Sequence, residues 1–387
     1  MSFQSHHPTH QQDILSDLPL ELFEEIASHL DIPALKALSL TSSVRRAACI
    51  RLFFHTLTLH GDHGRSSSSK FLADFKNQAP VPCLRKVILE GLKEDLSTAL
   101  LPWCTRVHSI KIQECRIGNT ALLPSLIVLN DLELLNLTFG SVVDYFWLLA
   151  SLPSTLKKLT ARGNTFCESQ SICHTVGYGI ELEHLETKSA EDLSLLLRDD
   201  CPLSLKSLRV AYVQQARPHD IEDLAQRTPH LIYLGLDIAT PDGRPRTCPI
   251  GLHYRTRAYT LPVSLPLTKL KSLSITDRTE SAEATVQLLS APSDVISTLD
   301  VLSFTSLLDN ELESLAIALS QPKFRNLKGL NLQIIDPHHF PFRHRLPFFD
   351  VEFRRFQRRL EALGRKIDLA TKVVAPDAIG SDIFRSF

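Results

Sequence analysis

The amino-acid sequence predicts an α/β solenoid, in which short parallel strands alternate with helices along the whole chain. Three observations lead to this class. Apolar residues spaced at i, i+3 and i+5 return eleven times between Phe54 and Leu332, and most returns lie 23 to 29 residues apart. Helix-like stretches, most of them followed by a proline, fill the intervals. A recurrence at this period is typical of solenoids, whose stacked units present a long surface.

The N-terminal part breaks this rhythm. We expect residues 1–12, which are polar and rich in histidine, to form a disordered tail without an apolar signal core. Residues 13–53 are predicted to form three short helices. A first helix starting at Pro19 carries apolar residues at steps of four, namely Leu18, Leu22, Ile26 and Leu30. Leu35 and Leu38 mark a second helix, and a Thr-Ser-Ser run can cap a third.

Residues 54–335 are predicted to form the repeats. The triplets begin at Phe54, Leu84, Val107, Leu132, Leu156, Leu182, Leu205, Leu231, Leu270, Leu299 and Leu327. The second and third residues of a triplet are two apart, so both point to the same face of a strand. Stacking the strands in parallel, about 4.8 Å apart, joins these side chains into one core and gives an arc of roughly 50 Å. The predicted return helices cover 142–152, 190–198, 221–227, 281–290 and 310–320.

Two later segments depart from the repeat. Residues 239–266 form an insertion rich in proline, glycine and arginine, and insertions of solenoids map to loops on one face. This loop can bind a partner through Arg244, Arg246 and Arg255, or it can be a tolerated insertion without a ligand. Residues 336–387 are predicted to form a linker and an amphipathic helix that caps the last repeat.

The motifs resemble two known families. The repeats resemble leucine-rich repeats, whose pattern places Asn or Cys three residues after the third leucine, as at Cys115 and Asn164. The segment opening with Leu18, Pro19 and Glu21 resembles the F-box, although the family usually closes on tryptophan where this chain has Phe54. The resemblance implies a leucine-rich-repeat horseshoe, with parallel strands on the concave face and helices on the convex face, preceded by a three-helix F-box.

The resemblance also implies a function. F-boxes bind the Skp-type adaptor of a cullin–RING ubiquitin ligase, so the chain would be the substrate-recognition subunit and the repeats would bind a target protein. The implied adaptor-binding residues are Leu18, Pro19, Leu22, Ile26, Leu30, Leu35 and Leu38. The alternative is a ubiquitin-independent scaffold or inhibitor, whose N-terminal helices only cap the solenoid, as repeat arrays commonly require.

The outward strand positions are candidates for target binding. Over the first half of the repeats the predicted row holds six basic residues and, with Glu90 and Glu186, two acidic ones. The basic candidates are Lys86, Lys111, Lys158, Arg162, Lys188 and Arg209. Guanidinium and ammonium groups bind carboxylates and phosphates, which favours an acidic or phosphorylated target. Exposed charges that only stay solvated are the alternative.

Composition sets the remaining expectations. The net charge is −1, so no bulk attraction to nucleic acid or to a membrane is expected. No apolar run approaches the roughly 20 residues that cross a bilayer. The eight cysteines show no paired spacing and indicate reduced thiols, hence a cytoplasmic or nuclear protein.

No motif predicts catalysis, a metal or a cofactor. The segment GRSSSSK lacks the glycine that precedes the lysine in a phosphate-binding loop, and Cys167, Cys173 and His174 have the wrong spacing for a zinc site. We therefore expect a non-catalytic binding protein that acts through its partners.

Overall fold

The computed structural model describes residues 18–53, 55–61, 84–91, 106–117, 128–168, 179–214, 218–238, 269–277, 289, 301–306, 312–335, 346–362 and 368–374. Several predictions fall elsewhere in the chain. The tail 1–12, the insertion 239–266 with its three candidate arginines, and Phe54 lie outside the described residues.

Three short helices begin the described chain: α1 (Leu20–Ser28), α2 (Ile32–Ser39) and α3 (Ser43–Phe53). Local capping explains where they start. Pro19 occupies the N-cap position of α1, and the Asp31 carboxylate accepts the Ala34 backbone N–H at 2.9 Å to begin α2. At the start of α3 the Ser42 hydroxyl accepts the Arg45 N–H at 3.1 Å.

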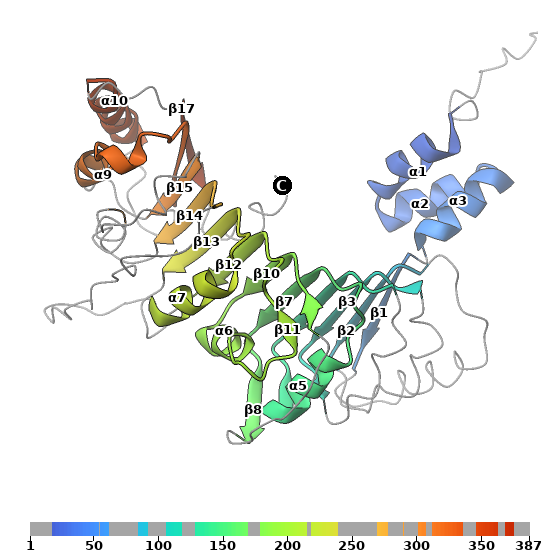
Figure 1. Ribbon diagram of the computed structural model, residues 1–387. Coiled ribbons are helices and arrows are strands. Elements are labelled where there is room, and N and C mark those ends of the chain that lie inside the picture. Colours follow the sequence, from blue (N-terminus) through green and yellow to red (C-terminus); the bar gives the residue numbers. More distant parts are fainter. Residues whose placement is uncertain are drawn as a thin grey trace, which may run out of the picture.

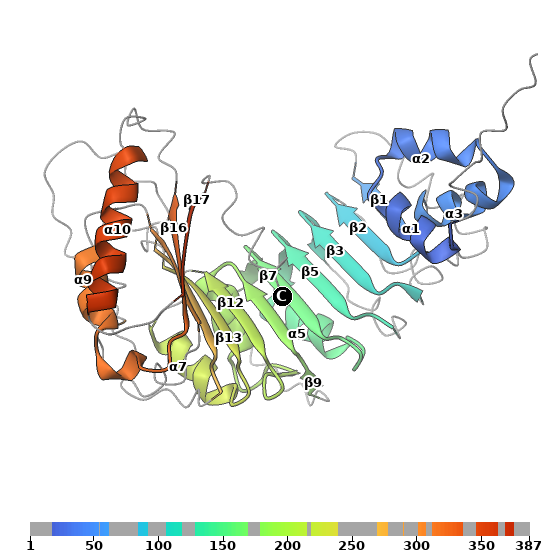
Figure 2. The same cartoon turned by 90° about the horizontal axis from the view of Figure 1, so that it is seen from above.

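A twelve-stranded sheet follows, and its neighbouring strands pair in parallel. The strands keep their chain order in space (Figures 1 and 2). They are β1 (Thr56–His60), β2 (Lys86–Glu90), β3 (Ser109–Gln113), β5 (Asp131–Leu135), β7 (Lys158–Arg162), β10 (His184–Thr187), β12 (Val210–Gln214), β13 (Tyr233–Ile238), β14 (Ser272–Asp277), β15 (Val301–Ser306), β16 (Gly329–Ile335) and β17 (Asp368–Val374). The predicted α/β class with a large parallel sheet is confirmed, and it is consistent with a leucine-rich-repeat-like fold.

Helices pack against one face of this sheet. They are α5 (Val142–Ala150), α6 (Ala190–Leu196), α7 (Pro218–Arg227), α9 (Leu312–Leu319) and the 3-10 turn η5 (Pro322–Phe324) (Figure 1). Short parallel ladders on the return segments supplement them: β4 (Arg116–Ile117), β6 (Thr138–Ser141) and β8 (Thr165–Glu168), then β9 (Ile180–Glu181) with β11 (Leu203–Ser204). The opposite face of the sheet bears none of these elements, and we call it the helix-free face.

The core lies between the sheet and the helices. In β2 and β3 the second and fourth residues are buried while the others are half-buried, which is the alternation of a strand with one covered face. Aligned side chains such as Val87, Ile110 and Leu132 then join into one cluster that runs through the sheet. This continuous cluster stabilises strands that are too short to bury their leucines alone.

The register corrects two of the predicted triplets. Ile110 pairs with Leu132 and Ile112 with Leu134, so the fourth unit begins at Leu129 and not at Leu132. Leu135, predicted to point inward, is half-buried on the helix-free face. The seventh unit shifts in the opposite direction along the chain, because Leu185 pairs with Ala211. Its triplet is Leu208, Ala211 and Val213, three residues later than predicted.

A left-handed residue follows four of the strands. Gly91, Glu114, Asn136 and Gly163 have φ values of 65°, 55°, 51° and 64°. The backbone N–H groups of Gly91, Glu114 and Asn136 each donate to the carbonyl of the last residue of the next strand; that of Glu114 donates to Leu135 at 2.9 Å. The left-handed conformation turns the chain off the sheet, and it is costly for the two residues that are not glycine.

The C-terminal part holds a strand that the sequence analysis missed. The amphipathic helix is α10 (Leu346–Ala362), whose Phe356 and Leu360 join the main core. Behind it, β17 pairs with β16 in parallel over seven residues, from Gly329 opposite Asp368 to Ile335 opposite Val374. The edge of β16 is therefore covered by a further strand, and not by a helix alone.

A buried polar network joins two neighbouring units. Asn164 is 6% exposed; its side-chain oxygen accepts the Leu137 N–H at 3.2 Å, and its amide donates to Asp192 at 2.9 Å. Asp192 is fully buried and also accepts the Ser189 hydroxyl at 2.7 Å, while Ser189 caps α6. Burial raises the pKa of Asp192, and these hydrogen bonds oppose that rise.

We expect Asp192→Ala to destabilise the sheet by about 2 to 3 kcal/mol, because it leaves the buried amide of Asn164 without an acceptor and weakens a helix cap. Chemical denaturation followed by circular dichroism measures this loss. Glu191→Ala is the matched control, since Glu191 is exposed at the preceding position. Equal stability of both variants would show that the network does not link the units.

Candidate functional site

The three N-terminal helices have a small hydrophobic core of their own. Phe23, Ala27, Leu35, Ala48 and Cys49 form it, with Leu38 and Leu52 packed against it. None of these residues belongs to the cluster beneath the sheet. Both views show the helices beyond the β1 end of the sheet, in blue (Figures 1 and 2). The helical module, residues 18–53, therefore packs as a separate unit.

This module bears an exposed apolar face. On α1 and in the turn after it, Leu22, Ile26 and Leu30 are 49%, 51% and 37% exposed, although they recur at helical spacing. Leu20, Leu40 and Ile50 are also large, apolar and exposed. Six of the nine exposed large hydrophobic residues in the described chain thus lie on this small module. Such a concentration is typical of an interaction surface.

The candidate adaptor-binding residues divide into two groups. Pro19, Leu22, Ile26 and Leu30 are exposed, and Leu18 is half-buried. Leu35 is only 7% exposed, and the half-buried Leu38 packs beside it, so these two residues contribute to the core of the module. The step of four along α1 predicted the exposed group. The inward-facing Phe23 and Ala27 were missed, although they too are four residues apart.

The second candidate site is the helix-free face. Its residues stand at the odd positions of each strand and line up in rows across the sheet. In the N-terminal half the described members are Thr56, Thr58, His60, Lys86, Ile88, Glu90, Ser109, Lys111, Gln113, Asp131, Glu133, Leu135, Lys158, Thr160, Arg162, His184 and Glu186. Lys188 follows the end of β10, and the exposed Arg209 precedes β12.

Acidic residues alternate with the basic ones on this face. Lys86 lies 4.0 Å from Glu133, which comes from the strand after next. Lys158 lies 4.0 Å from its register partner Asp131. The excess of basic residues is smaller than predicted, because the misplaced fourth unit hid Asp131 and Glu133. With these two, four acidic residues stand against the six basic candidates. Lys188 is paired as well, at 3.1 Å from the Glu186 carboxylate.

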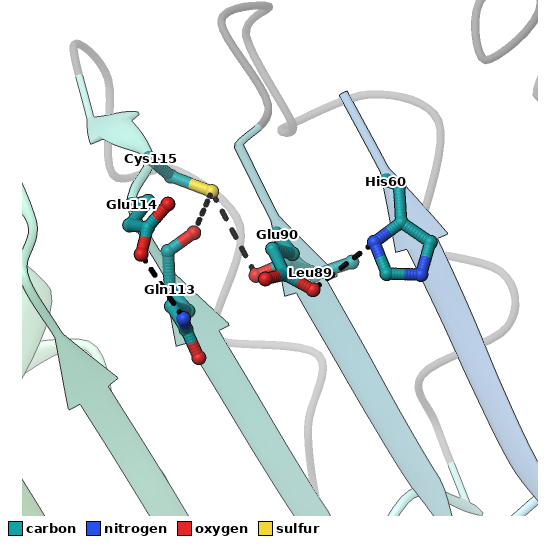
Figure 3. Close-up of polar contacts among 6 residues, drawn as sticks. All are labelled: His60, Leu89, Glu90, Gln113, Glu114 and Cys115. Atoms are coloured by element: carbon teal, nitrogen blue, oxygen red, sulfur yellow. Dashed lines mark hydrogen bonds and ion pairs between the residues drawn. The ribbon is translucent and has the colours of Figure 1, made fainter. Parts of the chain in front are cut away.

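The β1 edge repeats this balance (Figure 3). His60 on β1 lies 3.0 Å from the Glu90 carboxylate on β2, and the Gln113 amide donates to Glu114 at 3.1 Å. Cys115 turns inward beside them, where its thiol contacts the Gln113 and Leu89 carbonyls at 3.2 and 3.8 Å. Cys115 is 2% exposed and its thiol points to two backbone carbonyls, so this side chain packs as part of the core.

Burial shifts the pKa values of two groups in the middle of the face. It raises the pKa of Asp131, against the influence of the nearby Lys158. It lowers the pKa of His184, against the influence of Glu183. In both cases the larger cause is removal from water, which disfavours the charged form. Removal from water therefore favours the neutral imidazole of His184.

The helix-free face changes character toward β12, β13 and β14. Tyr212, Asp237 and Thr276 are 1%, 4% and 1% exposed, although they point away from the helices. Gly235 is paired with Tyr212, and a side-chain carbon on Gly235 would lie 2.4 Å from the tyrosine ring. The aromatic ring thus occupies the space that the glycine leaves. This zone is closely packed, whereas the charged zone from β2 to β7 is more open.

The described residues contain no cluster of three or more His, Cys, Asp or Glu side chains that could hold a metal ion. Within the same residues, no helix combines the length and the hydropathy needed to span a bilayer.

Comparisons with known proteins give little further information. No protein-family model matches the sequence. No curated protein matches it either. Among solved structures, the chain is similar to the leucine-rich repeat-containing protein LegL7 from Legionella pneumophila, with 12% identity over 83% of this chain and 91% of that chain and a TM-score of 0.39. A likeness this weak carries no argument about function.

Proposed function

We propose that this protein is a substrate receptor of a Skp/cullin/F-box ubiquitin ligase. In this proposal the helical module is an F-box that binds the Skp-type adaptor, and the leucine-rich repeats bind the target protein. The chain itself is non-catalytic and works in the cytoplasm or the nucleus. It acts by proximity, since tethering raises the effective concentration of target lysines near the ubiquitin carrier.

The exposed apolar face of the helical module carries the proposal. Leu22, Ile26 and Leu30 remain exposed although Phe23 and Ala27, on the same helix, already supply a core. A module of this size gains little stability from its own core, so leaving large apolar side chains in water calls for a partner. The F-box resemblance supplies the class of partner, because Leu22, Ile26 and Leu30 are among the apolar positions that carry this resemblance.

The competing proposal is a scaffold whose N-terminal helices only cap the solenoid. A cap would pack its apolar face on the first repeat and share that core. The two hydrophobic clusters are separate instead, and the apolar face of α1 lies outside both of them. This separation favours a docking module over a cap.

Deleting residues 1–52 distinguishes the two proposals. For a docking module, we expect the repeats to unfold at nearly the same denaturant concentration as in the full chain, while co-purification with the Skp-type adaptor is lost. For a cap, the repeats should lose stability or aggregate. An adaptor that stays bound to the truncated chain would refute the F-box assignment.

A further inference from the structure

Helix α10 carries a dense basic surface at the far end of the sheet. Four arginines on it are exposed: Arg354, Arg355, Arg358 and Arg359. On its other side, Phe356 and Leu360 are each 3% exposed and join the main core. Figures 1 and 2 place α10, in red, at the end of the sheet opposite to α1, α2 and α3. The helix is thus anchored through its apolar side and presents arginines outward.

Two of the four arginines, Arg354 and Arg358, carry charge that the described part of the fold does not neutralise. Arg354 and Arg358 are four residues apart, as are Arg355 and Arg359, and like charges at this spacing destabilise a helix. In the described part of the chain, Arg354 and Arg358 form no ion pair. The basic surface elsewhere differs, because lysines such as Lys86 and Lys158 stand beside carboxylates.

We propose that the arginine face of α10 binds an acidic segment of a partner protein, rich in Asp or Glu. The guanidinium group forms paired hydrogen bonds with a carboxylate, which suits arginine better than lysine to this task. Arg354 and Arg358 are about 6 Å apart along the helix axis. Alternate residues of an extended chain are separated by roughly 6.6 Å. An extended segment with carboxylates at alternate positions therefore matches the spacing of the arginines.

Two other anionic partners fit less well. A basic helix on a membrane inserts its apolar side into the bilayer, whereas Phe356 and Leu360 are already buried in the protein. A nucleic-acid-binding domain has a broad basic footprint, whereas this chain has a net charge of −1 and a pI near 7.0. A carboxylate-rich protein segment needs only the small patch that α10 provides.

The test uses the full chain and a fluorescent peptide of alternating glutamate and serine, with binding followed by fluorescence anisotropy. We expect saturable binding that weakens as salt is added, and no binding of a glutamine–serine peptide. The double variant R354E/R358E should weaken binding by about tenfold or more, because it replaces attraction by repulsion. The control K206E/R116E makes the same change in net charge at two exposed residues outside α10 and should bind like the wild type.

A second variant tests whether weaker binding could come from unfolding of α10. Arg354→Glu alone places a glutamate four residues before Arg358, an arrangement that stabilises a helix. Its circular dichroism should match that of the wild type while peptide binding falls. Equal binding by wild type and R354E/R358E would overturn the proposal. So would α10-dependent binding to phosphatidylserine vesicles or to duplex DNA in place of the peptide.

Discussion

Replacing Leu22 and Ile26 together by aspartate is expected to abolish adaptor binding, with a loss of about a hundredfold or more in affinity. Both side chains are about half exposed, so charges at these positions are tolerated by the helical module itself. In the proposed complex the same positions are buried, and an unpaired carboxylate there loses its hydration. Co-purification with the Skp-type adaptor, followed by titration calorimetry, measures the effect.

The control carries the same substitutions at exposed apolar residues of the repeats. Trp147→Asp plus Ile232→Asp fits this purpose, because these side chains are 57% and 41% exposed. This variant should bind the adaptor like the wild type. Full binding by the Leu22 and Ile26 variant, with its helices intact, would exclude α1 as the docking surface and would leave the F-box proposal without its main support.

Leu134→Ala is expected to lower the free energy of unfolding by about 3 kcal/mol, whereas Leu135→Ala should cost less than about 1 kcal/mol. Leu134 is completely buried in the main core, so truncation leaves a cavity. Leu135 is half-buried on the helix-free face, so its truncation leaves no enclosed cavity. Chemical denaturation of the two variants, each with the same change from leucine to alanine, makes the comparison direct.

A larger loss of unfolding free energy for Leu135→Ala than for Leu134→Ala would contradict the observed register. It would support the register predicted from spacing alone, in which Leu135 points inward. That outcome would also return Asp131 and Glu133 to positions off the helix-free face. The leucine pair therefore tests the charge distribution of the candidate target surface as well as the packing of the core.

The repeat period and the parallel sheet could be predicted because each strand must bury aliphatic side chains on one face. A strand of five residues does this with two aliphatic residues that are two positions apart, and this spacing is visible in the sequence. The exact phase was harder to predict where leucines are crowded. Leu129, Leu132, Leu134, Leu135 and Leu137 satisfy the i, i+3, i+5 pattern in two frames, and only the pairing with Ile110 decides between them.

The last strand escaped prediction for a different reason. The segment 368–374 carries Leu369, Thr371 and Val373 at the alternate positions of a strand, without the full leucine triplet. Pairing with β16 provides the stability that its own composition does not indicate. The spacing along α1 indicated an apolar stripe at Leu22, Ile26 and Leu30. It could not show that this stripe is exposed while Phe23 and Ala27 face the core of the module.

The strands stand in space in the order in which the ribosome makes them. Each strand from β2 to β17 pairs with the one that precedes it in the large sheet. A newly synthesised strand thus finds its neighbour already in place, and no strand has to wait for a distant segment. Folding can proceed during translation from the N-terminal end, with one unpaired edge moving along the growing chain until β17 completes the stack.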